Sequence, residues 1–182
     1  MSETIRPDFI PERYRDLAEI GKGGMGVVYR AHDTTLDRDV ALKVILPHFS
    51  FRPDFKDSFA REARALANLA HPNIIPVYDF SSDERGSWYV MALMTGKTLQ
   101  QLLEAGALPA ERFLETARSL LAALGHAHAN NILHRDIKAA NIFVNDDGHV
   151  FLGDFGVALP GSTEGSSLAS QQFHFQGTPA YA

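Results

Sequence analysis

The chain has no cysteine, only one tryptophan in 182 residues, and no long uninterrupted run of apolar residues. Without cysteine it can form neither disulfides nor thiolate metal sites, and the composition fits a reducing compartment. No stretch approaches the roughly 18 apolar residues that a membrane-spanning helix requires. The N-terminus also lacks the basic and then apolar layout of a signal peptide. We therefore expect a cytoplasmic chain without membrane contact of its own, and the sequence leaves open whether an anchor follows residue 182.

An excess of positive charge is missing as well. The chain carries 17 Lys and Arg against 22 Asp and Glu, a net charge of −5, and its basic residues are spread thinly. Bulk electrostatics therefore do not favour a nucleic-acid partner. The apolar content of 45% and the charged content of 21% are ordinary for a globular protein. The length predicts one domain, which can have two lobes.

The first half of the chain has mainly the pattern of β-strands. Residues 1–13 are polar and contain two prolines, which indicates a lead-in segment. Segments rich in Val, Ile, Leu and Tyr, separated by turn residues, predict strands at 14–20, 25–32, 38–46, 74–80 and 88–94. A helix is predicted over 54–69, because apolar residues recur there at spacings of three and four: Phe55, Phe59, Ala63, Leu66 and Leu69.

The second half is more helical. A short helix is expected at 99–103 and a long one from Pro109 onward, and the long helix has an apolar face made of Phe113, Ala117, Leu120, Leu121, Leu124 and His128. Two strands, 142–144 and 150–152, flank the tight-turn sequence 145–148, and 160–176 is expected to be a loop. The pattern predicts an α+β chain with a β-rich lobe over 14–94, a hinge near 94–97, and a second lobe over 95–182.

A glycine-rich string, Gly21-Lys-Gly-Gly-Met-Gly26, follows the first predicted strand. Dinucleotide-binding folds share this spacing, but there the glycines open a helix. Here Val27 and Val28 continue as a strand, which favours a hairpin whose backbone N–H groups lie over phosphate oxygens. A plain hairpin turn is the alternative for this string taken alone.

Three further strings follow in order: Val40-Ala-Leu-Lys43, His134-Arg-Asp-Ile-Lys-Ala-Ala-Asn141 and Asp154-Phe-Gly156. Together with the glycine string they resemble the signature set of protein kinases. The chain resembles a bacterial serine/threonine kinase of the eukaryotic-like (Hanks) type from about residue 14 to 182, and the resemblance stops before the family's Ala-Pro-Glu motif. It implies a bilobal kinase fold with a complete β-rich N-lobe and the first part of the helical C-lobe.

The same resemblance implies transfer of the γ-phosphate of ATP to Ser or Thr hydroxyls of proteins, with Mg²⁺, or alternatively Mn²⁺, as the cofactor. Lys43 would bind the phosphates, and Glu62 would hold Lys43 in place. Taken alone, Lys43 could be a solvated residue of an edge strand. Backbone groups near Met94 would contact the adenine edge. The full set of ATP-binding residues implied is Ile20, Gly21, Lys22, Gly23, Gly24, Met25, Gly26, Val28, Ala41, Lys43, Glu62, Met91, Ala92, Met94 and Phe143.

The catalytic roles fall on the later strings. Asp136 would accept or orient the proton of the substrate hydroxyl, and Lys138 would lie beside the γ-phosphate. Asn141 and Asp154 would hold Mg²⁺, a hard cation that prefers oxygen ligands. An incidental turn with charges is disfavoured by the number of matching positions.

Histidines near these strings invite other interpretations. His134 could be taken for a general base, but the resemblance implies that it packs as a structural residue against Phe155. A metal site at His126, His128 and His134 is disfavoured, because their spacing does not place all of them on one helix face and no cysteine supports it.

The resemblance implies that the second lobe, 95–182, contains an activation segment with phosphorylation sites. Kinases with an arginine before the catalytic aspartate, here Arg135, often need a phosphate there. Simple flexibility is an equally good interpretation of any one serine in this loop. Thr178 resembles the residue that shapes the Ser/Thr acceptor site, and the other phosphosite candidates are Ser162, Thr163, Ser166, Ser167 and Ser170.

Without the later helices of a kinase C-lobe, the long helix around Leu120 and Leu124 should expose an apolar face. A second copy of the chain or the remainder of the C-lobe would cover that face. A truncated nucleotide-binding interaction protein without transfer activity is therefore the alternative function. A small-molecule phosphotransferase is disfavoured, because the strings around Asp136 and Thr178 resemble those of kinases that act on peptides.

Overall fold

The computed structural model describes residues 7–51 and 53–155, with only the backbone at 53 and 54. Within these ranges the chain forms two compact units. Unit 1 comprises residues up to 70 together with 75–94, and unit 2 comprises 71–74 and the residues from 95 onward. Across the described residues, no helix combines the length and the apolar character needed to cross a membrane.

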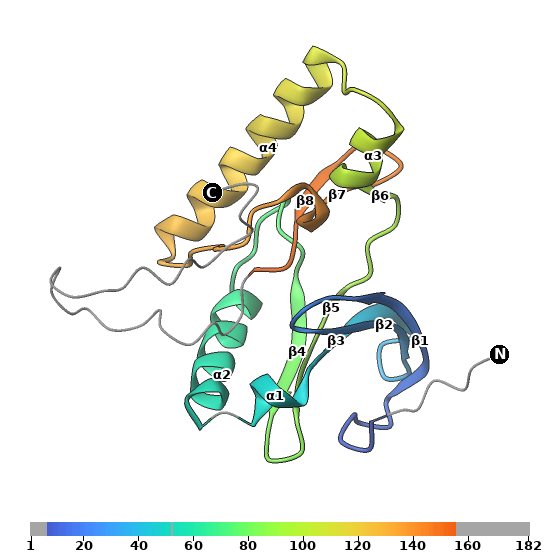
Figure 1. Cartoon of the computed structure of the whole chain (residues 1–182), viewed down its shortest axis with the longest axis vertical. Helices are drawn as coiled ribbons and strands as arrows, with labels where there is room; N and C mark the ends of the chain where they lie inside the picture. The colour runs from blue at the N-terminus through green and yellow to red at the C-terminus, as the bar shows by residue number, and fades with distance from the viewer. Residues whose placement is uncertain (1–6, 52, 156–182) are drawn as a thin grey trace, which may run out of the picture. The chain divides into compact units, whose positions relative to one another are not determined.

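Unit 1 is built on a five-stranded antiparallel sheet with the order β1-β2-β3-β5-β4 (Figure 1). Its strands are β1 (Tyr14–Lys22), β2 (Gly26–Asp33), β3 (Arg38–Ile45), β4 (Val77–Ser82) and β5 (Ser87–Ala92). The sequence placed Ser81 and Ser82 in the connecting turn, but both continue β4. Ser82 lies opposite Ser87, and their hydroxyls are 2.7 Å apart, so a polar pair closes the ladder where apolar periodicity gives no signal.

One face of this sheet carries the core of unit 1. Val40, Leu42 and Val90 are completely buried there, together with Tyr14, whose ring meets the Trp88 ring edge to face at 5.8 Å. Tyr14 donates its hydroxyl to Asp79 at 2.7 Å, and burial raises the pKa of this tyrosine well above its usual value. The β-branched and aromatic residues of the strand pattern thus fill one side of the pleat.

The lead-in segment also belongs to this core, although its composition is polar. Ile10 is only 3% exposed, and Phe9 packs so close to Gly86 that a Cβ there would meet the Phe9 ring at 2.7 Å. Arg13 binds Asp33 at 2.8 Å, and this hydrogen bond lowers the pKa of the Asp33 carboxyl below its usual value. The segment therefore closes the sheet instead of merely preceding it.

Helix α2 (Pro53–Ala67) packs against β4 and β5 in unit 1, after the single turn α1 (Pro47–Ser50). The residues predicted to form its apolar stripe are all buried: Phe55, Phe59, Ala63 and Leu66, with Leu69 just beyond its end. The Phe59 ring lies 6.4 Å from that of Tyr89 on β5, so α2 covers the face of the sheet that carries Tyr89.

Unit 2 contains the sheet β6-β7-β8, formed by β6 (Lys97–Thr98), β7 (Ile142–Val144) and β8 (Val150–Leu152). Its helices are α3 (Leu99–Ala105), α4 (Ala110–Ala129) and the 3-10 turn η1 (Ala139–Asn141). Thr98 begins α3 with a reciprocal capping box to Gln101. The predicted turn between β7 and β8 is confirmed, since Gly148 donates its backbone N–H to Asn145 O at 2.9 Å and has the left-handed φ of +88°.

The short segment 71–74 belongs to unit 2 and is fixed to β8. Asn73 donates its side-chain amide to Val150 O and accepts the Leu152 backbone N–H, each at 2.8 Å. The His71 ring lies 5.2 Å from that of His126 on α4. Nothing in the sequence indicated these contacts, by which the segment anchors the chain to the hairpin that precedes Asp154.

Helix α4 packs against β8 with small residues and leaves its bulky ones outside. Its buried positions are Thr116, Ala123 and Ala127, which allow the helix to approach the hairpin closely. Of the predicted apolar face, Phe113 and Leu121 are 59% and 69% exposed. Leu120 and Leu124, around which the exposure was expected, are half-buried, so the face is exposed only in part.

Candidate functional site

The glycine hairpin of unit 1 connects β1 to β2. Gly21 lies opposite Val28, and Gly23 donates its N–H to Gly26 O at 2.9 Å across the turn. A Cβ on Gly26 would overlap the carbonyl of Val44 on β3, so the packing of the sheet itself requires this glycine.

The three earlier glycines have no such requirement. A Cβ on Gly21, Gly23 or Gly24 would meet no other atom of the chain within 4 Å, and none of the three has a left-handed φ. A plain tight turn therefore does not explain why they are glycine. The open space around these three positions leaves room for an anionic group to approach the hairpin backbone.

Lys43 lies on β3 next to this hairpin. It is opposite Val28 on β2 and opposite Tyr89 on β5, and its Nζ lies 5.9 Å from the centre of the Tyr89 ring. Ala41, two residues earlier, lies opposite Met91 and points to the same face. The register thus gathers Val28, Ala41, Lys43 and Met91 on one side of the sheet.

Glu62 lies on α2, between the buried residues Phe59 and Leu66, and is half-buried. Since α2 covers the face of the sheet that carries Tyr89, Glu62 and Lys43 lie on the same side of it. The predicted adenine-edge positions are Ala92, the last residue of β5, and Met94, two residues later, and both are half-buried. Ile20, another predicted ATP contact, is 53% exposed.

The loop between α4 and β7 in unit 2 positions the carboxylate of Asp136. Lys138 Nζ donates to Asp136 Oδ2 at 2.7 Å, and Asn141 Nδ2 donates to the same oxygen at 3.1 Å. The Asn141 amide also donates to the backbone oxygen of Asp136 at 2.8 Å. Two neighbouring donors, one of them a cation, thus fix the position of the carboxylate.

The buried side chain of His134 stabilises this loop through hydrogen bonds. It is 2% exposed, its Nε2–H donates to Gly153 O at 2.8 Å, and its Nδ1 accepts the Asp136 backbone N–H at 3.3 Å. Both ring nitrogens are therefore engaged in the neutral form, and burial lowers the pKa of the imidazole. Its ring also lies 4.5 Å from Phe155, so the predicted packing of His134 as a structural residue is confirmed.

The β7–β8 hairpin brings Asn141 and Asp154 to one end of the small sheet. Ile142 lies opposite Leu152, and Gly153 donates its N–H to Asn141 O at 2.9 Å. Asp154 follows Gly153 with a left-handed φ of 52°, and Arg135 in the neighbouring loop has a φ of 64°. Such backbone strain in non-glycine residues is concentrated at functional sites.

These two side chains suit a hard cation. The Asn141 amide nitrogen is committed to Asp136, which directs the amide oxygen the other way. Together with the Asp154 carboxylate, this gives the oxygen ligands that Mg²⁺ prefers. Phe143, the predicted adenine contact of unit 2, lies two residues after Asn141 on β7 and is half-buried.

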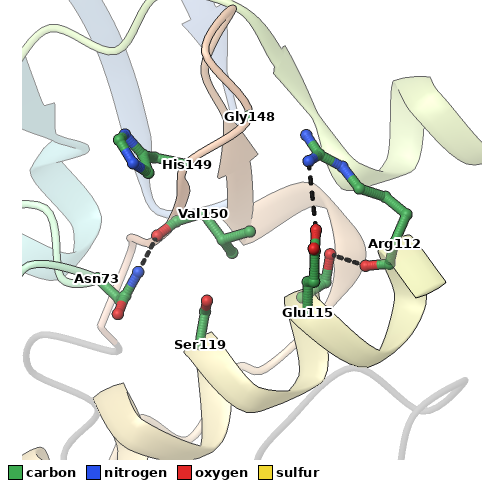
Figure 2. A pocket seen from close by; sticks show the side chains of 8 residues that line it. Asn73, Arg112, Glu115, Ser119, Gly148, His149 and Val150 are labelled. Atoms are coloured by element: carbon green, nitrogen blue, oxygen red, sulfur yellow. Dashed lines mark hydrogen bonds and ion pairs between the residues drawn. The ribbon is translucent and has the colours of Figure 1, made fainter.

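A pocket of about 210 Å³ in unit 2 lies between α4, the β7–β8 turn and Asn73 (Figure 2). None of the predicted site residues lines it. It is smaller than the roughly 300 Å³ at which pockets for small molecules begin. Its one pair of opposite charges, Arg112 and Glu115, lies 3.6 Å apart.

Some predicted residues lie outside the described ranges. These are Thr178 and the phosphosite candidates Ser162, Thr163, Ser166, Ser167 and Ser170. Conversely, sequence reasoning missed Asn73, which holds the β7–β8 hairpin through its side-chain amide and backbone oxygen, and Gly153, which donates its backbone N–H to Asn141 O. The only local signal was an asparagine after a proline, and it is equally typical of a turn.

Comparison with known proteins agrees with this geometry. The protein kinase domain family matches residues 14–182. A probable serine/threonine-protein kinase of Clostridium acetobutylicum is 42% identical over 150 residues, which cover 82% of this chain and 23% of that protein. PrkC of Bacillus subtilis is 39% identical, again over 82% of this chain and 23% of that protein, and PknL of Mycobacterium tuberculosis is 41% identical over 85% and 39%.

The crystal structure of the Mycobacterium tuberculosis PknI kinase domain is similar, with a TM-score of 0.76 and 28% identity. The match covers 86% of this chain and 64% of that structure. The chain thus spans between 23% and 39% of the length of these three kinase relatives. Fold, motifs and sequence agree, and the chain belongs to the protein kinase domain family.

Proposed function

We propose that the chain transfers the γ-phosphoryl group of ATP to Ser or Thr hydroxyls of proteins. The observation that carries this proposal is the Asp136 carboxylate, fixed by Lys138 at 2.7 Å and Asn141 at 3.1 Å. Phosphoryl transfer demands positioning and charge neutralisation more than covalent chemistry from the protein. An anchored carboxylate beside a cation suits that demand.

In the proposed reaction, Asp136 accepts the proton of the acceptor hydroxyl while the oxygen of that hydroxyl bonds to the γ-phosphorus. The bond between that phosphorus and the β,γ-bridging oxygen breaks, and ADP leaves. Lys138 neutralises charge on the transferred group. Mg²⁺, held by Asn141 and Asp154, would neutralise charge on the phosphate oxygens when bound.

Unit 1 supplies the remaining groups of the proposal. The backbone of Gly21 to Gly26 and the Lys43 ammonium would hold the phosphates, and Glu62 would orient Lys43. Val28, Ala41 and Met91 offer apolar surface for adenine on the same face as Lys43. The remaining proposed nucleotide contacts, one of them in unit 2, are Ile20, Lys22, Met25, Ala92, Met94 and Phe143.

Activation-loop autophosphorylation is part of the proposal, with Arg135 as the group that a phosphate would engage. Its acceptors would be among Ser162, Thr163, Ser166, Ser167, Ser170 and Thr178. A nucleotide-binding interaction protein without transfer activity is the second candidate. The exposure of Phe113 and Leu121 on α4 favours it, because large exposed apolar patches mark interaction surfaces.

Transfer of labelled γ-phosphate from Mg-ATP, to the chain itself and to a generic basic protein, tests the proposal. Asp136→Asn is the matched control, because it keeps the shape of the side chain and removes its charge. Label that disappears with Asp136→Asn supports the kinase. Mg-ATP binding without any transfer supports the second candidate.

A further inference from the structure

A side-chain contact in unit 1 crosses a whole strand. Arg38 begins β3 and Tyr78 lies on β4, yet these strands are not neighbours, because β5 separates them. Adjacent strands lie about 4.8 Å apart, so the β3 and β4 backbones are roughly 10 Å apart. Arg38 Cζ nevertheless lies 3.7 Å from the centre of the Tyr78 ring. The two side chains therefore meet over β5.

The register locates the crossing at the end of β5. Val40 lies opposite Ala92, the last residue of β5, and Val77 lies opposite Met91. Arg38 is two residues before Val40 and so shares its face with Ala92. Because Ala92 carries only a methyl group, the guanidinium and the ring have room above the strand. This is the opposite face from that of Lys43.

A β-bulge directs the tyrosine there. The β4–β5 register shifts between Val77 and Asp79, which leaves Tyr78 as the extra residue. Bulges turn a side chain to a new direction and are frequent near active sites. Just before the bulge, Pro76 O accepts the backbone N–H of Ala92 at 3.0 Å, so the bulged segment also holds the end of β5 directly.

The chemistry of Arg38 is unusual for a residue at a strand end. Its Nε is buried and has no hydrogen-bond partner, and no other buried side-chain nitrogen or oxygen of the described residues lacks one. Leaving such a donor unpaired costs free energy. The stack on Tyr78 is the interaction that holds this guanidinium, since arginine prefers to lie flat on an aromatic face.

We infer that Arg38 and Tyr78 are positioning residues for the nucleotide. They clamp the end of β5, so that the backbone at Ala92 and Met94 is already arranged to receive the adenine edge. This inference rests on the proposed function. A preorganised binding segment loses less conformational freedom when its ligand binds, so removing the clamp weakens binding of the adenine part specifically.

The test compares two ligands of the 182-residue chain, Mg-ATP and Mg-tripolyphosphate, by titration calorimetry. Tripolyphosphate has no base and engages only the phosphate-binding groups. We expect Arg38→Met and Tyr78→Ala to weaken ATP binding about fivefold, in line with the strength of such a stack, and to leave tripolyphosphate binding unchanged. The KM for ATP rises by the same factor while kcat stays constant.

Three further variants sharpen the result. Tyr78→Phe keeps the ring and should bind ATP like the unsubstituted chain. The double variant of Arg38→Met and Tyr78→Ala should be no weaker than either single variant, because both remove one interaction. Arg85→Ala, at a side chain 63% exposed in the β4–β5 hairpin, is the control and should change nothing.

Each outcome supports or refutes the clamp. Equal weakening of ATP and tripolyphosphate would show a merely structural role, and unchanged ATP binding in Arg38→Met would refute the clamp. If Tyr78→Ala fails to fold, Arg38→Met still carries the test, because it keeps the apolar part of the side chain. Failure of the unsubstituted chain to bind ATP would refute the proposed function, and the inference with it.

Discussion

Stability should fall in mildly acidic solution, because His134 is buried in its neutral form. Its burial lowers the pKa of the folded imidazole below 6.5, the value expected for the unfolded chain. The unfolded state therefore binds a proton more readily, and lowering the pH through this range favours unfolding. The contribution of His134 is fully present above about pH 6.5 and is lost as the pH falls.

The size of the effect follows from one proton. Lowering the pH from about 7.5 to about 5.5 removes at most about 1.4 kcal/mol from the free energy of unfolding, the limit set by one proton bound to the unfolded imidazole. His71 adds a loss of the same sign, because burial and the neighbouring His126 lower its pKa too. A domain of this size has only about 5–15 kcal/mol in total, so the loss is measurable.

Urea unfolding followed by far-ultraviolet circular dichroism measures this, since α4 contributes strongly to the signal. His134→Gln can donate and accept hydrogen bonds but cannot take up a proton. We expect it to lower stability at neutral pH and to flatten the dependence on pH. A His134→Gln variant with the same pH slope as the unsubstituted chain would refute the assignment of a buried neutral imidazole.

Four other substitutions test the geometry. Gly26→Ala should destabilise the chain by at least about 2 kcal/mol, because its Cβ would overlap β3. Gly24→Ala should keep the melting temperature of the unsubstituted chain and weaken Mg-ATP binding. Equal melting temperatures for Gly26→Ala and Gly24→Ala would contradict this contrast. Asn141→Ala should slow phosphoryl transfer at saturating ATP at least about 100-fold, since it removes a hydrogen bond that fixes the Asp136 carboxylate. An unchanged transfer rate would contradict the role of Asn141 in positioning Asp136. Tyr14→Phe should cost about 1–3 kcal/mol in urea unfolding, because it removes the hydrogen bond that the buried hydroxyl donates to the Asp79 carboxylate, and it should leave transfer unchanged.

Local patterns predicted much of this molecule. Alternating Val and Leu predicted β3, and the stripe containing Phe55 and Phe59 predicted α2, because burial of one face imposes those periods. The motif around Asp136 predicted roles for Lys138 and Asn141 as well, but it did not predict that both side chains donate to the Asp136 carboxylate.

Features that depend on contacts distant in sequence were not predictable. Ile10 is buried by strands that follow much later, so its polar surroundings were misleading. Asn73 reaches β8 across 77 residues, and only the fold shows this contact. The register shift that turns Tyr78 onto Arg38 leaves no trace in hydrophobic periodicity.

The most direct test of the central claim separates nucleotide binding from chemistry at one side chain. The rate of γ-phosphate transfer from saturating Mg-ATP and the Kd for Mg-ATP would be measured for the chain and for Asp136→Asn. The account predicts a fall in the transfer rate of at least about 100-fold with a Kd changed less than about threefold. Transfer by Asp136→Asn at the rate of the unsubstituted chain would contradict it.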